Sequence, residues 1–169
     1  MLDNPNIELR LNTDYKDILH NTQYDNLIYT GAIDEFFDYE YGELPYRSLR
    51  FANKNLSIEQ YQPLAIINYP NNYDFTRITE YKYFLNEKSN STTISIEYPE
   101  VFEIGKNERY YPIPKEGNQN AFENYVRKAQ SLQNVRFIGR LAQYRYYNID
   151  QVIGASLKEF EKILQEIKI

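Results

Sequence analysis

Short segments in which apolar and polar residues alternate occupy the first two thirds of the chain. Alternation with a period of two residues is typical of half-buried β-strands, and short apolar runs closed by turn residues are typical of buried ones. Breakers such as PNNYD and NEKSNS separate several of these segments. The pattern predicts strands at 7–11 and 26–31, then one helical turn at 33–37. A meander of antiparallel strands is predicted after it, at 46–51, 64–69, 76–84, 92–98 and 109–113.

A helical period replaces the alternation in the last third of the chain. The apolar residues there recur every three or four positions, as they do on one face of an α-helix: Ala121, Phe122, Tyr125, Val126, Ala129 and Leu132. A buried strand is expected at 135–139, and a second helical pattern predicts a long final helix through Ile149, Val152, Ile153, Leu157, Phe160, Leu164 and Ile167. The fold class is therefore α+β, with an antiparallel sheet followed by helix, strand and helix.

The loop before the final helix, GRLAQYRYYNID at 139–150, has the features of a binding site. Asn148 is placed to be the N-cap of the helix, and Gln151 is placed to complete a capping box. In open α/β folds, ligands bind where strands end and helices begin, because free N–H groups there meet negative charge or polar cofactor atoms. Arg140 adds a cation. The plainer alternative is that Asn148 only caps the helix.

Composition excludes several classes of function. Net charge is −5 and the basic residues are scattered among acids, so we expect neither nucleic acid nor a membrane surface as a partner. No cysteine is present, which excludes disulfides and thiol catalysis and is compatible with the cytoplasm, where we expect the protein. No apolar run approaches the ~20 residues of a membrane helix. Tyrosine is abundant, with 18 residues, and we expect most of them to pack in the sheet.

Metal and nucleotide motifs are sparse. The single histidine, His20, lies in a polar stretch without companion ligands, so no metal site is predicted. A dinucleotide site normally begins with glycines two and three residues apart, whereas no two of the six glycines here lie closer than 11 residues. The chain carries at most the second half of such a site.

One pair of predicted strands contains charged side chains that could bind or act on a ligand. If 76–84 and 92–98 pair as a hairpin, Arg77 and Glu97 lie on the same polar face. A guanidinium suits a diphosphate, because its planar fork makes paired charge-assisted hydrogen bonds, and a nearby carboxylate orients sugar hydroxyls or stabilises a cation. An exposed ion pair is the plainer reading. Asn68 could bind a sugar hydroxyl or serve only the turn that follows it.

Six segments, in this order, resemble the carboxyl-terminal part of the UDP-galactopyranose mutase family: LIYTGAIDEFFDYEYGELPYRSLRF, INY, FTRITEYKYF, IEYPE, RYYPIP and NVRFIGRLAQYRYYNIDQVI. The resemblance runs from about residue 24 to residue 157. No single segment is diagnostic, but their common order and spacing are specific.

The resemblance implies a flavoenzyme, an isomerase that interconverts UDP-galactopyranose and UDP-galactofuranose in cell-surface polysaccharide biosynthesis. The family uses reduced FAD, whose N5 attacks the anomeric carbon as UDP leaves, which is covalent catalysis by the cofactor. It also implies three parts of the chain: partial FAD-domain strands at 1–34, an antiparallel substrate lobe at 35–117, and the helix, strand and final helix of the dinucleotide (FAD)-binding fold at 118–169.

The family's functional residues carry over to matching positions. The resemblance implies that Arg77 in TRI and Glu97 in EYP are catalytic. It implies that the substrate is bound by Asn68, Arg77, Tyr111 and Tyr146, and that the cofactor is bound by Gly139, Arg140, Asn148, Ile149 and Asp150. Several bacterial members have aspartate where this chain has Asn148, so a charge at that position is not expected here.

Other parts of the family's site have no counterpart in these 169 residues. These are the glycine-rich loop, a histidine beside the flavin, the helical lobe that holds uridine, and a mobile loop with a second arginine. We therefore expect the partners to be the missing amino-terminal FAD and helical lobes and the UDP-sugar, with a homodimer as a candidate assembly and little activity alone. The alternative is a non-enzymatic module that binds a nucleotide sugar or a carbohydrate.

Overall fold

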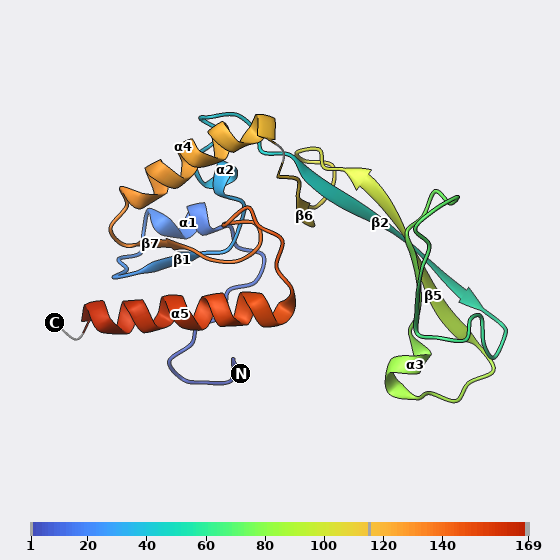
Figure 1. Cartoon of the computed structure of the whole chain (residues 1–169). Helices are drawn as coiled ribbons and strands as arrows, with labels where there is room; N and C mark the ends of the chain where they lie inside the picture. The colour runs from blue at the N-terminus through green and yellow to red at the C-terminus, as the bar shows by residue number, and fades with distance from the viewer. Residues whose placement is uncertain (1, 115, 168–169) are drawn as a thin grey trace.

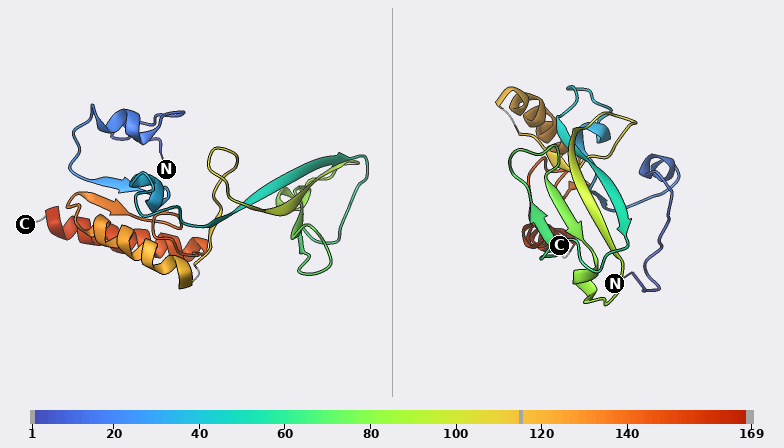
Figure 2. Two further views of the ribbon diagram at one scale, coloured as in Figure 1. Left: turned by 90° about the horizontal axis from the view of Figure 1, so that it is seen from above. Right: turned by 90° about the vertical axis from the view of Figure 1, so that its right-hand side faces the viewer.

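The computed structural model describes residues 2–114 and 116–167, which form two lobes (Figure 1). The first lobe contains α1 (Tyr15–Leu19), β1 (Leu27–Tyr29), α2 (Ile33–Phe36), α4 (Gln119–Gln130), β7 (Val135–Phe137) and α5 (Ile149–Ile167). The second lobe contains β2 (Tyr46–Leu56), β3 (Ile66–Asn68), β4 (Arg77–Glu80), α3 (Lys82–Leu85), β5 (Thr92–Val101) and β6 (Tyr111–Pro112). A short 3₁₀ turn, η1 (Glu116–Asn118), leads into α4. From above, the sheet of the second lobe extends away from the first lobe as an arm (Figure 2).

The first lobe is built on a two-stranded parallel sheet. Strands β1 and β7 pair in parallel, with Leu27 opposite Val135 and Tyr29 opposite Phe137. Helix α4 lies on one side of this sheet and α5 on the other (Figure 1). Helix, strand and final helix therefore follow the order that the sequence predicts, and α5 has the predicted apolar positions along its length.

Buried tyrosines hold the core of the first lobe together. Tyr46, Tyr125 and Tyr144 belong to one buried cluster with Ala32, Ile33 and Leu44. Each ring brings a hydroxyl inside, and each hydroxyl finds a backbone partner, as buried polar groups must. The Tyr144 hydroxyl lies 2.8 Å from the carbonyl oxygens of both Pro45 and Ile113, and burial raises the pKa of Tyr144 to about 12. These contacts fix the points where the chain enters and leaves the sheet.

The second lobe is a five-stranded sheet in the order β3-β4-β5-β2-β6. Its pairs are antiparallel, as predicted, and the ten pairs between β2 and β5 run without interruption from Arg47 opposite Val101 to Leu56 opposite Thr92. The predicted simple meander is wrong in one respect. β2 does not pair with β3, the next strand in sequence, but lies between β5 and β6.

One face of this sheet is apolar and covered by the chain itself. Ile78, Ile94 and Ile96 form a buried cluster, and Tyr69, Phe75 and Tyr98 pack against it. Ile78 and Ile96 are register partners, so they share that face, and residues one position away point to the opposite face. The opposite face is the polar one.

Two predicted strands differ from the structure. The segment 7–11 is not a strand, because its apolar residues find no neighbour and stay exposed, with Leu9 at 60% and Leu11 at 73%. The predicted strand 76–84 ends at Glu80, and a helical turn follows it that ends on Asn86 in the left-handed conformation. Helix α1 was not predicted.

Glu80 explains why that strand stops. Its buried carboxylate accepts hydrogen bonds from the Thr92 hydroxyl at 2.7 Å, from the backbone N–H of Gln62 at 2.9 Å and from that of Tyr61 at 3.1 Å. The loop before β3 is thereby fastened over the end of β4 and β5. Burial by itself raises the pKa of Glu80, but these hydrogen bonds outweigh it and hold the pKa below its ordinary value.

We expect Glu80→Gln to lower the free energy of unfolding by roughly 1–3 kcal/mol near neutral pH, because an amide N–H₂ group replaces an acceptor that three donors face. Since the pKa of Glu80 is lowered in the folded state, this stabilisation is present above the unfolded pKa and is lost as the pH falls through the folded one. Urea unfolding of wild type and Glu80→Gln at neutral and at acidic pH measures the loss of stability and its dependence on pH. Glu100→Gln, at an exposed ion pair, is the control. A gap between Glu80→Gln and wild type that does not narrow in acid would contradict this account.

Candidate functional site

Three of the predicted site residues form a row across the polar face of the sheet. Asn68 is the register partner of Arg77, and Arg77 is the register partner of Glu97. The Arg77 Nε donates to the Asn68 Oδ1 at 2.9 Å, and Arg77 Nη1 lies 3.6 Å from Glu97 Oε2. The prediction that Arg77 and Glu97 share a polar face is confirmed.

Within this row the Arg77 guanidinium is partly exposed to solvent, whereas the Glu97 carboxylate is nearly buried. The Arg77 side chain is 40% exposed, whereas the Glu97 side chain is 13% exposed and accepts a hydrogen bond from the Thr76 hydroxyl at 3.0 Å. A guanidinium that is oriented on two sides but open to solvent is suited to bind an anion. The carboxylate beside it is fixed in place, so it is able to orient a hydroxyl or face a developing positive charge.

A second group gathers around Arg140, in the loop before α5. Its guanidinium lies 4.9 Å from the ring centre of Tyr111 and 5.1 Å from that of Tyr146, and these two rings stack at 5.8 Å. Arg140 also donates to the backbone carbonyls of Tyr147 at 2.6 Å and Tyr110 at 3.3 Å. The Tyr146 side chain is exposed, so it offers a hydroxyl and a ring face to a ligand.

The start of α5 lies beside the Arg140 group. Asn148, Ile149 and Asp150 are all exposed, and the Gln151 side chain accepts from the backbone N–H of Asn148 at 2.9 Å. This is one half of the predicted capping box. The first turn of a helix has backbone N–H groups without partners inside the helix, and here the residues of that turn are exposed. The arrangement therefore offers donors to a polar ligand.

The two groups share one side of the sheet but do not touch. Tyr111 is the register partner of Arg47, which lies on the same face of β2 as Phe51, the register partner of Glu97. From Arg77 to Tyr111 the sheet is crossed by three strand spacings and followed by four residues along β2. With ordinary strand dimensions, the two backbone positions are roughly 20 Å apart. The predicted residues therefore form a strip with a cluster at each end.

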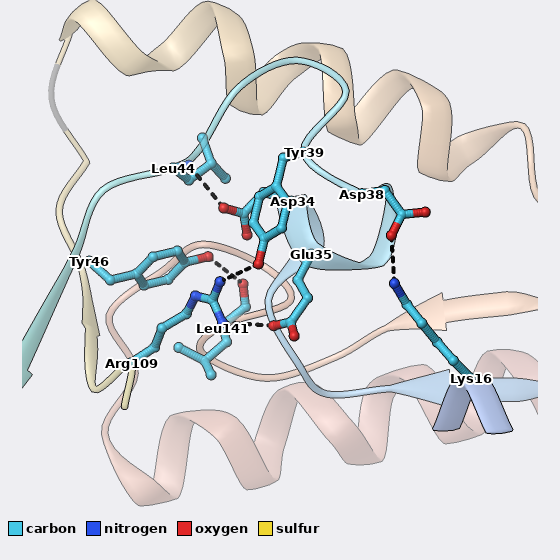
Figure 3. A network of polar contacts seen from close by, with 9 residues as sticks. All are labelled: Lys16, Asp34, Glu35, Asp38, Tyr39, Leu44, Tyr46, Arg109 and Leu141. Atoms are coloured by element: carbon cyan, nitrogen blue, oxygen red, sulfur yellow. Dashed lines mark hydrogen bonds and ion pairs between the residues drawn. The ribbon is translucent and has the colours of Figure 1, made fainter. Parts of the chain in front are cut away.

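A polar network that the sequence analysis missed fixes the segment before Tyr111 (Figure 3). Arg109 donates to Glu35 at 2.7 Å and to the Tyr39 hydroxyl at 2.9 Å, while Asp34, which is fully buried, accepts from the backbone N–H of Leu44 at 2.9 Å. Burial raises the pKa of Asp34. In the sequence, the one sign of this network was the acid Asp34 within the otherwise largely apolar segment AIDEFF.

Half of a dinucleotide site fits the loop from 139 to 150. Gly139 has a φ of +102°, and nothing lies within 4 Å of the point where a side chain would begin. A flat ligand or a phosphate could therefore approach the backbone closely, next to the Arg140 cation and the N-terminus of α5. The donor set thus fits a flat or anionic polar ligand, the class to which the FAD implied by the resemblance belongs.

The chain is similar in sequence to proteins of one known family. A model of the family described as UDP-galactopyranose mutase matches residues 1–146. This chain belongs to the UDP-galactopyranose mutase family. It is 37% identical to the UDP-galactopyranose mutase of Mycoplasma pneumoniae, over 98% of this chain and 45% of that protein. It is 32% identical to the dTDP-fucopyranose mutase of Escherichia coli, over 94% of this chain and 44% of that protein.

A solved structure shows the same fold. It is described as the crystal structure of reduced UDP-galactopyranose mutase, and it matches 85% of this chain and 42% of its own with a TM-score of 0.69 and 16% identity. The chain thus spans less than half the length of the family members it matches. Among the described residues, no helix is both long and apolar enough to cross a membrane.

We expect Gly139→Ala to lower the free energy of unfolding by about 1–3 kcal/mol, because alanine is strained at this positive φ even though space is free around it. Gly154→Ala is the matched control. Gly154 lies inside α5 with open space around it, so alanine there should raise stability by up to ~1 kcal/mol. Urea unfolding of both variants measures the difference. Equal effects of the two substitutions would contradict the backbone assignment at Gly139.

Proposed function

We propose that this chain supplies the substrate-binding sheet and the final strand, loop and helix of a UDP-galactopyranose mutase, which interconverts UDP-galactopyranose and UDP-galactofuranose. The observation that carries the proposal is the row of Asn68, Arg77 and Glu97 in a chain that belongs to this family. The names of two relatives, UDP-galactopyranose mutase and dTDP-fucopyranose mutase, both describe a pyranose carried on a nucleoside diphosphate. A diphosphate site is what such ligands have in common.

In this proposal the arginine of the row binds the diphosphate and the acid works on the sugar. Arg77 has the open guanidinium, and Asn68 holds its Nε so that the remaining N–H groups point to the ligand. Glu97 is fixed by Thr76 and Arg77, so its charge stays close to the anomeric carbon, where positive charge develops as UDP leaves. Tyr111 and Tyr146 contribute hydroxyls to the diphosphate from the other end of the strip.

Reduced FAD, when bound, supplies the nucleophile of the reaction, its N5 atom. The residues of this chain that would hold it are Gly139, Arg140, Asn148, Ile149 and Asp150. Gly139 allows close approach of the ligand, Arg140 supplies a fixed cation, and the start of α5 supplies backbone N–H groups. Asn148 is neutral, so its part is to position the helix and the cofactor by hydrogen bonds.

The remaining FAD and helical lobes are the proposed protein partners. Two features of the first lobe support this. A pocket of about 420 Å³ lies between α4, β7 and α5, and all three residues of β7 line it, so it follows an edge of that strand. On α5, apolar side chains three or four positions apart are exposed: Ile149, Ile153, Leu157, Phe160, Leu164 and Ile167. Such a surface is typical of a protein interface, and without its partner we expect little activity.

The alternative function is a module that binds sugars without catalysis. It differs from the mutase proposal in what the ligand must contain. A carbohydrate module needs only the sugar, whereas the row around Arg77 needs the diphosphate.

We therefore expect this chain to bind UDP more tightly than galactose, and Arg77→Ala to weaken UDP binding by roughly tenfold or more, because charge-assisted hydrogen bonds to phosphate are lost. NMR titration of the two ligands measures this. Arg50→Ala is the matched control, because Arg50 is the register partner of Tyr98 and lies on the opposite face of the same sheet. Tighter binding of galactose than of UDP, or equal loss in both variants, would contradict the proposal.

A further inference from the structure

We infer that Arg109 holds the arm, the sheet from β2 to β6, on the first lobe from the face opposite the strip, and so fixes the orientation in which the arm presents Arg77. Arg109 belongs to the arm, because it lies between β5 and β6. Its hydrogen-bond acceptors, Glu35 and Tyr39, lie on α2 of the first lobe and directly after it. Arg109 is thus a positioning residue, and this role goes beyond the proposed function because it concerns how the two lobes are held together.

The chain passes between the lobes at two neighbouring places, before β2 and after β6. The N–H of Ile113 donates to the Pro45 carbonyl at 3.0 Å, and the Tyr144 hydroxyl lies 2.8 Å from the carbonyl oxygens of both residues. These contacts fix the position of the base of the arm. Because they lie side by side, the arm could still rotate about them, so its orientation depends on contacts made elsewhere.

Two arginines contact the base of the arm, one on each face of the sheet. Arg140 lies on the face of the strip, with its guanidinium 4.9 Å from the ring centre of Tyr111. The guanidinium of Arg109 lies 4.2 Å from the ring centre of Phe102 and 5.5 Å from that of Tyr46. Tyr46 is the residue before the register partner of Tyr111 on β2, so its side chain points away from the strip. The base is therefore held from both sides.

The contacts of Arg109 are the tighter of the two sets (Figure 3). Arg109 donates to Glu35 at 2.7 Å and to the Tyr39 hydroxyl at 2.9 Å, and its side chain is only 12% exposed. A guanidinium that uses its planar fork for two acceptors fixes a direction as well as a distance. Arg140 reaches the arm through ring contacts and through one hydrogen bond of 3.3 Å, to the Tyr110 carbonyl. Arg109 is therefore the stronger restraint on orientation.

The acceptors of Arg109 belong to a firmly held part of the first lobe, α2 and the loop that follows it. The fully buried Asp34 of α2 accepts from the N–H of Leu44, near the end of this loop, at 2.9 Å. The Tyr125 hydroxyl, from α4, donates to the Gly42 carbonyl in the same loop at 2.8 Å. The loop is thereby fastened to two helices, so a hydrogen bond to it ties the arm to the body of the first lobe.

The length of the arm makes its orientation important for the strip. Arg77 lies roughly 20 Å from Tyr111 at the base, so a rotation of ~10° at the junction would move Arg77 by roughly 3 Å relative to the first lobe. Hydrogen bonds tolerate only a few tenths of an ångström of such displacement. A ligand that contacts the Arg140 group would then find Arg77 out of place.

Spin labels in the two lobes test the inference directly, because the chain has no cysteine of its own. Lys54→Cys on β2 and Lys158→Cys on α5, both at exposed positions, place one label in each lobe. Double electron–electron resonance then measures the distance between the labels, and the intact junction should give one narrow distribution. We expect Arg109→Gln to broaden or shift this distribution by roughly 3 Å or more, the displacement of a ~10° rotation.

Arg50→Gln is the matched control. Arg50 makes the same kinds of contact, an ion pair with Glu100 at 2.9 Å and a ring contact with Tyr98 at 4.1 Å, but all three residues belong to the arm. Its substitution should leave the distribution unchanged. An unchanged distribution in Arg109→Gln, or equal broadening in Arg50→Gln, would overturn the inference.

A second variant covers the case in which Arg109→Gln does not fold, as judged by circular dichroism. The double variant Glu35→Gln, Tyr39→Phe keeps Arg109 but weakens both of its hydrogen bonds across the junction. It should broaden the distribution in the same way, and an unchanged distribution would overturn the inference. The measurement contains no ligand, so its failure leaves the proposed function standing, and a failure of the chain to bind UDP leaves this inference standing.

Discussion

The uninterrupted pairing of β2 with β5 is the constraint on which the rest of the strip depends. Ten consecutive register pairs contain no bulge, so the side chains keep their alternation from Arg47 to Leu56. A slip of β5 by one residue would turn Glu97 to the covered face and Ile94 and Ile96 to the polar face. The burial of Ile94 and Ile96 therefore fixes the orientation of Glu97 and Phe51.

The abundant tyrosines serve two different purposes. Tyr46, Tyr125 and Tyr144 are buried and satisfy their hydroxyls on the backbone, so they make the base from which the sheet extends. Tyr111 and Tyr146 stack beside Arg140 instead, where a ligand can reach them. Tyr144 and Tyr146 are only two residues apart in the same loop, yet the ring of Tyr144 is buried and that of Tyr146 is exposed.

Sequence periodicity was sufficient for the strand pair and for the last two helices. Arg77 and Glu97 meet because both belong to alternating segments with isoleucines on the other face, which is a local signal. It was not sufficient for residues whose conformation depends on distant partners. The chain turns after Glu80 because that acid is held by a loop about 20 residues earlier, and residues 7–11 remain irregular because no strand lies beside them.

The Arg109 network was missed for a similar reason. Its partners Glu35 and Tyr39 are about 70 residues away in sequence, so no local pattern joins them. Periodicity also said nothing of the distances between the predicted site residues, which pairing in the sheet spreads along a strip. The spacing of the site residues follows from the strand order and register of the sheet. In that order β2 lies beside β5 and not beside β3.

The most direct test of the strip is to map where UDP-galactose binds, by recording side-chain chemical shifts of the isotopically labelled chain as the ligand is added. The account predicts shifts along one continuous path from Asn68 through Glu97 and Phe51 to Tyr111 and Tyr146. It predicts none around Arg50 and Tyr98 on the opposite face. Shifts confined to that opposite face, or to the pocket between α4 and α5, would contradict it.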